Sequence, residues 1–138
     1  MTDPRAPSPA LETIQTKLAN GALDEAGTLI DELLVAFASD PNLAYLSALR
    51  YRLSGNAAKA LQTLSDLTAR FPDMARAHQE IAVNCLSINL PQKALEAAET
   101  AVTLDGSLLA CWELLAPLQQ RFAPEKREIT EQQIAFLK

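Results

Sequence analysis

The sequence predicts an all-α protein built from repeated pairs of antiparallel helices. Its 138 residues include 24 Ala and 23 Leu, so these two strong helix formers occupy about a third of the chain. Hydrophobic residues make up 49% of the chain but aromatic residues only 5%, so the apolar side chains are mainly small and aliphatic. Turn-forming and small residues also recur at one fixed spacing. Together these observations exclude a β-sandwich or a β-barrel and favour helical hairpins.

Four series of positions repeat with a spacing of 34 residues. Self-similarity at a fixed period of this length indicates stacked helical hairpins. The series are turn formers (Gly21, Gly55 and Asn89), small residues of one helix (Ala26, Ala60 and Ala94), small residues of the other helix (Ala48, Ala82 and Ala116) and a variable position (Ala44, His78 and Trp112). We therefore expect about three complete helix pairs, a partial fourth and a C-terminal helix.

The first pair is predicted between residue 9 and Phe37. Ser8–Pro9 suits the cap and first turn of its first helix, and Asn20–Gly21 suits the turn between the two helices. Ser39–Asp40–Pro41 ends the pair. Residues 1–8 have neither the apolar core of a signal peptide nor the length of a membrane span, so we expect a flexible polar leader there.

The second pair follows the same plan. Four leucines from Leu43 to Leu53 have helical spacing and stop at the breaker Ser54–Gly55–Asn56. A second helix carries apolar residues from Ala60 to Leu67, and Phe71–Pro72–Asp73 ends it.

The third pair repeats this arrangement. Its first helix contains Ile81 to Leu86, and its second contains Ala94 to Ala101. Asn89–Leu90–Pro91 lies between them, where Pro91 suits a first helical turn. Asp105–Gly106–Ser107 closes the pair.

The last part of the chain departs from the repeat. Pro117 lies inside the helix that Trp112 begins, and because proline lacks an amide N–H, we expect it to end or kink this helix. Arg121–Pro124 is then a connection to a terminal helix that includes Phe136 and Leu137. The predicted divisions are the leader (1–8), the helical repeat domain (9–121) and a capping or linker helix (122–138).

The alanines have a predicted packing role. A methyl group lets two helix axes approach closely, whereas a larger side chain would separate them. We expect Ala60 to face Ala48, and Ala94 to face Ala82. The full set of predicted repeat-packing residues is Ala26, Ala48, Ala60, Ala82, Ala94, Ala116 and Trp112.

Charge and cysteine content narrow the functional classes. The net charge is -5, from 12 Lys and Arg against 17 Asp and Glu, and no segment is dense in cations, so we expect no nucleic-acid partner. No segment suits a membrane span. Cys85 and Cys111 each lie in an apolar helical pattern, which favours buried thiols over a disulfide or a metal site and favours the cytoplasm as the location.

No catalytic or cofactor motif is present in the sequence. His78, the one histidine, shares the phase of Ala44 and Trp112, so we expect it to pack at the seam of a hairpin rather than bind a metal. The acid pairs Asp24–Glu25 and Asp31–Glu32 have no nucleophile or histidine in their pattern and are typical of a solvated helix surface. The dispersed glycines form no phosphate-binding loop. We therefore expect neither enzymatic activity nor a cofactor in this chain.

The repeat resembles the tetratricopeptide repeat (TPR) family from Ala10 to about Gln120. Its fullest match to the first helix of that family is the spacing of Trp112, Leu115 and Ala116, and Asp24–Glu25–Ala26 resembles the second helix. Other positions depart from the family pattern, with Ser47 at a usual Leu and Cys85 at an aromatic site. The resemblance implies a superhelix whose groove, lined by the first helix of each pair, binds peptides or protein surfaces.

The family pattern also implies which residues line this groove. In chaperone-binding members, Lys and Asn clamp a terminal carboxylate, but this sequence has Tyr45, Leu49, Gln79 and Val83 there, which favours an amphipathic helix or an extended peptide with apolar anchors. The alternative is that Leu49, Val83 and Leu86 only pack between repeats. The implied groove residues are Asn42, Tyr45, Leu49, Arg52 and Leu53 in the second pair, and Arg76, Gln79, Val83 and Leu86 in the third.

Three functional classes remain open. The first is a protein-binding adaptor. The second is the N-terminal module of a larger enzyme, because Gln132–Leu137 resembles the join in bacterial TPR–sulfotransferase proteins, which implies catalysis beyond Lys138. The third is a homodimer formed through apolar faces at the ends of the repeat array.

Overall fold

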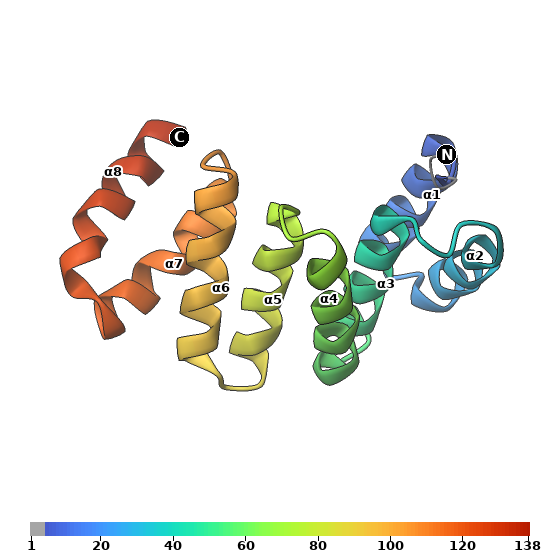
Figure 1. Ribbon diagram of the computed structural model, residues 1–138, viewed down its shortest axis with the longest axis horizontal. Coiled ribbons are helices and arrows are strands. Elements are labelled where there is room, and N and C mark those ends of the chain that lie inside the picture. Colours follow the sequence, from blue (N-terminus) through green and yellow to red (C-terminus); the bar gives the residue numbers. More distant parts are fainter. Residues whose placement is uncertain (1–4) are drawn as a thin grey trace. The chain divides into compact units, whose positions relative to one another are not determined.

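A computed structural model describes residues 5–138, and this part of the chain is all-α, with eight α-helices, one short 3-10 helix and no strand (Figure 1). The helices are α1 (Ser8–Ala19), α2 (Leu23–Ala36), α3 (Pro41–Leu53), α4 (Ala57–Arg70), α5 (Ala75–Ser87), α6 (Pro91–Leu104), α7 (Leu109–Phe122), η1 (Pro124–Lys126) and α8 (Arg127–Leu137). The predicted all-α class of helix pairs is confirmed. The helices form two compact units, an N-terminal unit ending at Phe71 and a C-terminal unit from Pro72 to Lys138.

The N-terminal unit contains the first two helix pairs. Helix α3 packs against α4 and also contacts both α1 and α2. The buried core between α1, α2 and α3 is aliphatic, because each helix directs the apolar face of its pattern inward. Its main members are Ile14, Leu18, Ala26, Ile30, Leu43 and Leu46.

The C-terminal unit contains α5 to α8. Helices α5 and α6 form a tightly packed antiparallel pair, α7 packs on α6, and α8 packs on α7 (Figure 1). Alanines make up most of the buried face of α6, namely Ala94, Ala97, Ala98 and Ala101. Cys85 and Cys111 are buried free thiols in this unit, as predicted.

The first three helix pairs each turn at a residue with left-handed backbone geometry. The φ angles are 78° at Gly21, 83° at Gly55 and 62° at Asn89. Glycine adopts this conformation at no steric cost, and asparagine tolerates it better than most residues. The spacing of 34 residues that the sequence shows at these positions therefore reflects a backbone requirement of the hairpin turn.

The N-terminal segment is held more firmly than the expected leader. Ala6 is buried, and its backbone N–H donates to Asp40 Oδ2 at 2.7 Å. Both Arg5 and Arg70 donate to the carbonyl of Ser39, and both guanidinium groups lie over the ring of Phe71. Helix α1 then begins at residue 8. From residue 5 onward, the predicted leader therefore makes defined contacts with the segment just before α3, while residues 1–4 lie outside the described part and a flexible leader stays a prediction.

Pro117 does not end its helix, so of the two expected effects, an end or a kink, the first is wrong. Helix α7 continues through Pro117 to Phe122, and Ala123 alone separates it from η1. Proline removes the N–H that would bond to the carbonyl of Glu113, but both residues are exposed, so water can satisfy that carbonyl. The connection predicted at Arg121–Pro124 is therefore much shorter, and η1 leads directly into α8.

Candidate functional site

The groove residues predicted in the second pair lie along α3, and we call them the α3 face. Their spacing of three or four residues places them on one side of the helix. Asn42 is exposed and Leu53 is 45% exposed, whereas Arg52 is half-buried. Tyr45 and Leu49 are also half-buried, and both pack against the core of the N-terminal unit. For Leu49, the alternative of a packing role therefore has a structural basis.

The residues predicted in the third pair lie along α5, and we call them the α5 face. Arg76 is exposed and Leu86 is 39% exposed, while Gln79 and Val83 are half-buried. The charge of Arg76 also acts on the turn after α6. There, hydrogen bonds from the side chain and backbone of Ser107 lower the pKa of Asp105, and Arg76 lowers it further. The α5 face thus combines an apolar end with a cationic end.

The predicted repeat-packing residues fall into two groups. Five alanines on α2 to α6 have no exposed surface. Ala116 and Trp112 on α7 are only half-buried. The fully buried alanines are Ala26, Ala48, Ala60, Ala82 and Ala94.

The variable position of the repeat forms the same hydrogen bond in two pairs. His78 Nε2 donates to the carbonyl of Pro72 at 2.9 Å, and Trp112 Nε1 donates to the carbonyl of Gly106 at 2.9 Å. In each case the acceptor lies six residues earlier, in the turn before the helix. His78 therefore ties the start of α5 to the preceding turn, a contact that was not predicted, and packing of His78 at the hairpin seam stays a prediction.

A close contact between α2 and α3 was not predicted. The Arg50 guanidinium lies against Gly27, so close that a β-carbon at Gly27 would stand 2.9 Å from Arg50 Cζ. Arg50 Nε is buried without a hydrogen-bond partner. A glycine inside a predicted helix was the available signal, since such a glycine often marks a close approach.

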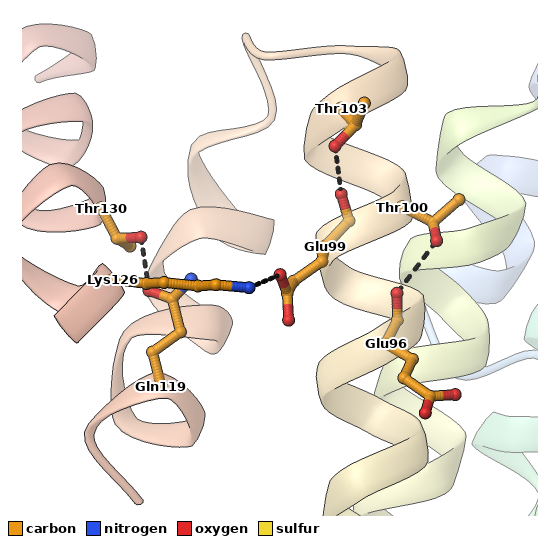
Figure 2. Close-up of polar contacts among 7 residues, drawn as sticks. All are labelled: Glu96, Glu99, Thr100, Thr103, Gln119, Lys126 and Thr130. Atoms are coloured by element: carbon orange, nitrogen blue, oxygen red, sulfur yellow. Dashed lines mark hydrogen bonds and ion pairs between the residues drawn. The ribbon is translucent and has the colours of Figure 1, made fainter. Parts of the chain in front are cut away.

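A cavity in the C-terminal unit was also not predicted, and we call it the α8 cavity. It has a volume of about 250 Å³ and lies between α6, α7, η1 and α8. Lys126 Nζ of η1 forms an ion pair with Glu99 Oε2 of α6 at 3.1 Å beside it (Figure 2). Its lining residues are Glu99, Val102, Thr103, Trp112, Leu115, Gln119, Lys126, Ile129 and Thr130.

The two thiols and the residue types that can bind metals have the following properties in the described part of the chain. Burial raises the pKa of the Cys85 thiol and raises that of the Cys111 thiol to about 11, so both stay protonated near neutral pH. Between residues 5 and 138, no three His, Cys, Asp or Glu side chains group as metal ligands would. The helices in the same range lack the combined length and hydropathy of a membrane-spanning segment.

Solved structures share this arrangement of helices. No model of a known protein family matches the sequence, and no curated protein sequence matches it. One solved structure is a MamA RS-1 double mutant. Its alignment covers 94% of this chain and 73% of the MamA chain at 18% sequence identity, with a TM-score of 0.77. Another is MamA from Desulfovibrio magneticus RS-1, from residue 41 to its end. This alignment covers 96% of this chain and 73% of the MamA chain at 19% sequence identity, with a TM-score of 0.72.

A third structure, PilF from Pseudomonas aeruginosa, aligns with 94% of this chain and 75% of its own at 12% identity and a TM-score of 0.56. MamA and PilF are both tetratricopeptide-repeat proteins. This chain has the tetratricopeptide-repeat fold. The TPR resemblance of the sequence is therefore confirmed at the level of the fold, while the resemblance to TPR–sulfotransferase proteins stays a prediction.

Proposed function

We propose that this TPR chain is a non-catalytic interaction module, and that the α3 face of the N-terminal unit and the α5 face of the C-terminal unit are each a binding surface for a peptide or helix of a partner protein. The TPR fold supports the proposal, because such repeats present the first helix of each pair to their ligands. The observation that carries it is the exposure of Leu53 and Leu86, whose apolar side chains stand beside polar residues of the same faces. Apolar anchors with polar neighbours suit an amphipathic partner segment.

Two residues of these faces suit mutation best. Leu53 and Leu86 are the most exposed apolar members, so replacing them with serine removes the proposed anchors at little cost to the folded state. Tyr45 and Leu49 are less suitable because they also pack against the N-terminal core. Val35 on α2 is 88% exposed and lies outside both faces, so Val35→Ser is the matched control.

The test has two stages. Immobilised protein first captures partners from a lysate of the source cells, and each candidate is then purified and its dissociation constant measured by calorimetry. We expect the Leu53→Ser/Leu86→Ser variant to bind its partner at least about tenfold more weakly, as for loss of interface anchors, and Val35→Ser to bind as the original chain does. Equal affinity of the double variant, with an unchanged circular dichroism spectrum, would remove the proposal.

A further inference from the structure

The α8 cavity has an apolar lining with one strongly exposed member. Val102 and Leu115 are buried, and Trp112 is half-buried. Ile129 of α8 is 68% exposed although it borders the cavity. A large aliphatic side chain that stays in water beside an open apolar cavity favours the entry of a further apolar group.

The wall of the cavity is fixed by a buried hydrogen bond. Thr130 Oγ1 of α8 donates to Gln119 Oε1 of α7, and both side chains are almost fully buried (Figure 2). Arg127 adds a bond to Gln120 Oε1 at 2.6 Å. Because these polar groups satisfy one another, they hold α8 against α7 and leave the cavity preformed.

An internal cation already occupies the acidic edge of the cavity. Figure 2 shows the Lys126 side chain extending from η1 to Glu99 on α6, where the ion pair is 3.1 Å long. The two side chains are 52% and 33% exposed. An ion pair so open to water contributes little to stability, so another cation can replace Lys126 at Glu99.

Size and charge identify the group that fits. A cavity of about 150 Å³ accommodates a benzene molecule, so the α8 cavity, at about 250 Å³, is large enough for one leucine or aromatic side chain. The C-terminal unit carries six Lys and Arg against nine Asp and Glu, and its net charge of about -3 therefore attracts a cationic segment.

We propose that the α8 cavity binds a cationic segment of a partner protein that carries one large apolar side chain next to a Lys or Arg. The apolar side chain enters the cavity and contacts Trp112 and Ile129, and the adjacent cation replaces Lys126 at Glu99. The α8 cavity has no residue in common with the α3 and α5 faces, although its proposed ligand is likewise a segment of a partner protein.

Trp112 allows a direct test, because it is the one tryptophan of the chain and borders the cavity. The probe is an acetylated and amidated heptapeptide, Gly-Ala-Lys-Leu-Lys-Ala-Gly, titrated into the ¹⁵N-labelled full chain to millimolar concentration. The readout is the indole N–H cross-peak of Trp112. We expect this cross-peak and those of Ile129 and Glu99 to shift in a saturable way.

Two comparison peptides test the contribution of the cationic side chains and that of the apolar side chain to binding. Replacing both peptide lysines by glutamate, or the peptide leucine by alanine, should each weaken binding about fivefold or more. No shift with the Lys-Leu-Lys peptide, or equal binding of the glutamate peptide, overturns the proposal. Shifts of the Trp112 cross-peak on raising the protein concentration without peptide also overturn it, because the occupant is then a second copy of the chain.

Exposed residues of the site allow substitutions that leave the fold intact. Glu99→Gln and Ile129→Ser should weaken binding of the Lys-Leu-Lys peptide, whereas Lys126→Ala should strengthen it about threefold because Glu99 loses its internal partner. Val35→Ser, which also changes an exposed apolar residue, should bind as the original chain does. Leu53→Ser/Leu86→Ser should also leave binding of the Lys-Leu-Lys peptide unchanged. The proposal for the α8 cavity and the proposal for the α3 and α5 faces can therefore be refuted independently. Unchanged binding in Glu99→Gln contradicts the proposed cation site.

Discussion

Ala60 shows how a single methyl group controls the packing of a helix pair. It lies on α4, has no exposed surface, and belongs to the helix that packs against α3. We expect Ala60→Leu to overpack this contact and to lower the free energy of unfolding by about 1 to 3 kcal/mol. Urea denaturation followed by circular dichroism measures the change. Ala58→Leu is the control, since Ala58 is exposed on the same helix, and a similar loss in both variants would contradict the close approach.

Cys111 is expected to lower the stability of the folded chain at high pH. Burial raises the pKa of its thiol to about 11 in the folded chain, above its ordinary value of 9.0. Between these two values the unfolded chain releases the proton and the folded chain keeps it, so stability falls as the pH rises. We expect the midpoint of urea unfolding to decline from pH 8.5 to 10.5 less steeply in Cys111→Ala than in the original chain. Parallel declines would show that the thiol does not contribute.

Among single residues, the sequence predicted those whose role recurs in every repeat. It missed contacts that a residue makes in one repeat only. The phase of 34 residues identified the alanines that are buried and the turn residues that are left-handed. The same period also included Ala116, which is only half-buried in the structure. The contact of Arg50 with Gly27 has no equivalent at the other three glycines, which all lie in the described part of the chain, so no period reveals it.

Asp40 links two elements that are far apart in the chain. Its side chain caps α3 by accepting the N–H of Asn42 at 2.8 Å and also accepts the N–H of Ala6 at 2.7 Å. Because Asp40 is fully buried, Asp40→Ala leaves both donors without a partner, and we expect it to cost about 1 to 3 kcal/mol of stability.

Hydrogen exchange can separate the two roles of Asp40. We expect Asp40→Ala to increase exchange at the amides of both Ala6 and Asn42. Asn56→Ala is the matched control, because Asn56 caps α4 at an exposed site by accepting the N–H of Lys59 at 3.1 Å. A loss of stability no larger than in the control would mean that the bond to Ala6 is unimportant.

The ends of helices were predicted where a turn residue determines them. Gly55 and Asn89 mark the turns after α3 and α5, and Pro91 lies in the first turn of α6 as expected. The expectation that Pro117 could end α7 is wrong, because a helix can continue past a proline when water reaches the carbonyl that the proline leaves free. That exposure is a tertiary property, and the local sequence around Pro117 does not encode it.

The whole chain consists of two units, each with buried residues of its own. Among the described residues, the C-terminal unit buries α5 against α6 and α6 against α7. We expect a fragment of residues 72–138 to fold alone, since domains of about 60 residues can do so. Circular dichroism should show a helical spectrum and a cooperative thermal transition. A spectrum of an unfolded chain would mean that the N-terminal unit is needed for this part to fold.

The division into units could not be predicted from the repeat. Phe71–Pro72–Asp73 has the composition of an ordinary end of a helix pair, and Phe37 occupies the equivalent position of Phe71 one period earlier. The α8 cavity was missed for a related reason. It depends on where α8 packs after the repeat has ended, and the chain contains no second example of that packing.

The three left-handed turns at Gly21, Gly55 and Asn89 restrict how this gene can change in length. After duplication or loss of 34 codons within the array, every turn still holds a residue that tolerates a positive φ. An insertion of ten codons in a helix instead places a side chain with a β-carbon at the reversal and rotates the apolar stripe away from its partner. Natural variants of this protein should therefore differ by whole helix pairs more readily than by fractions of one.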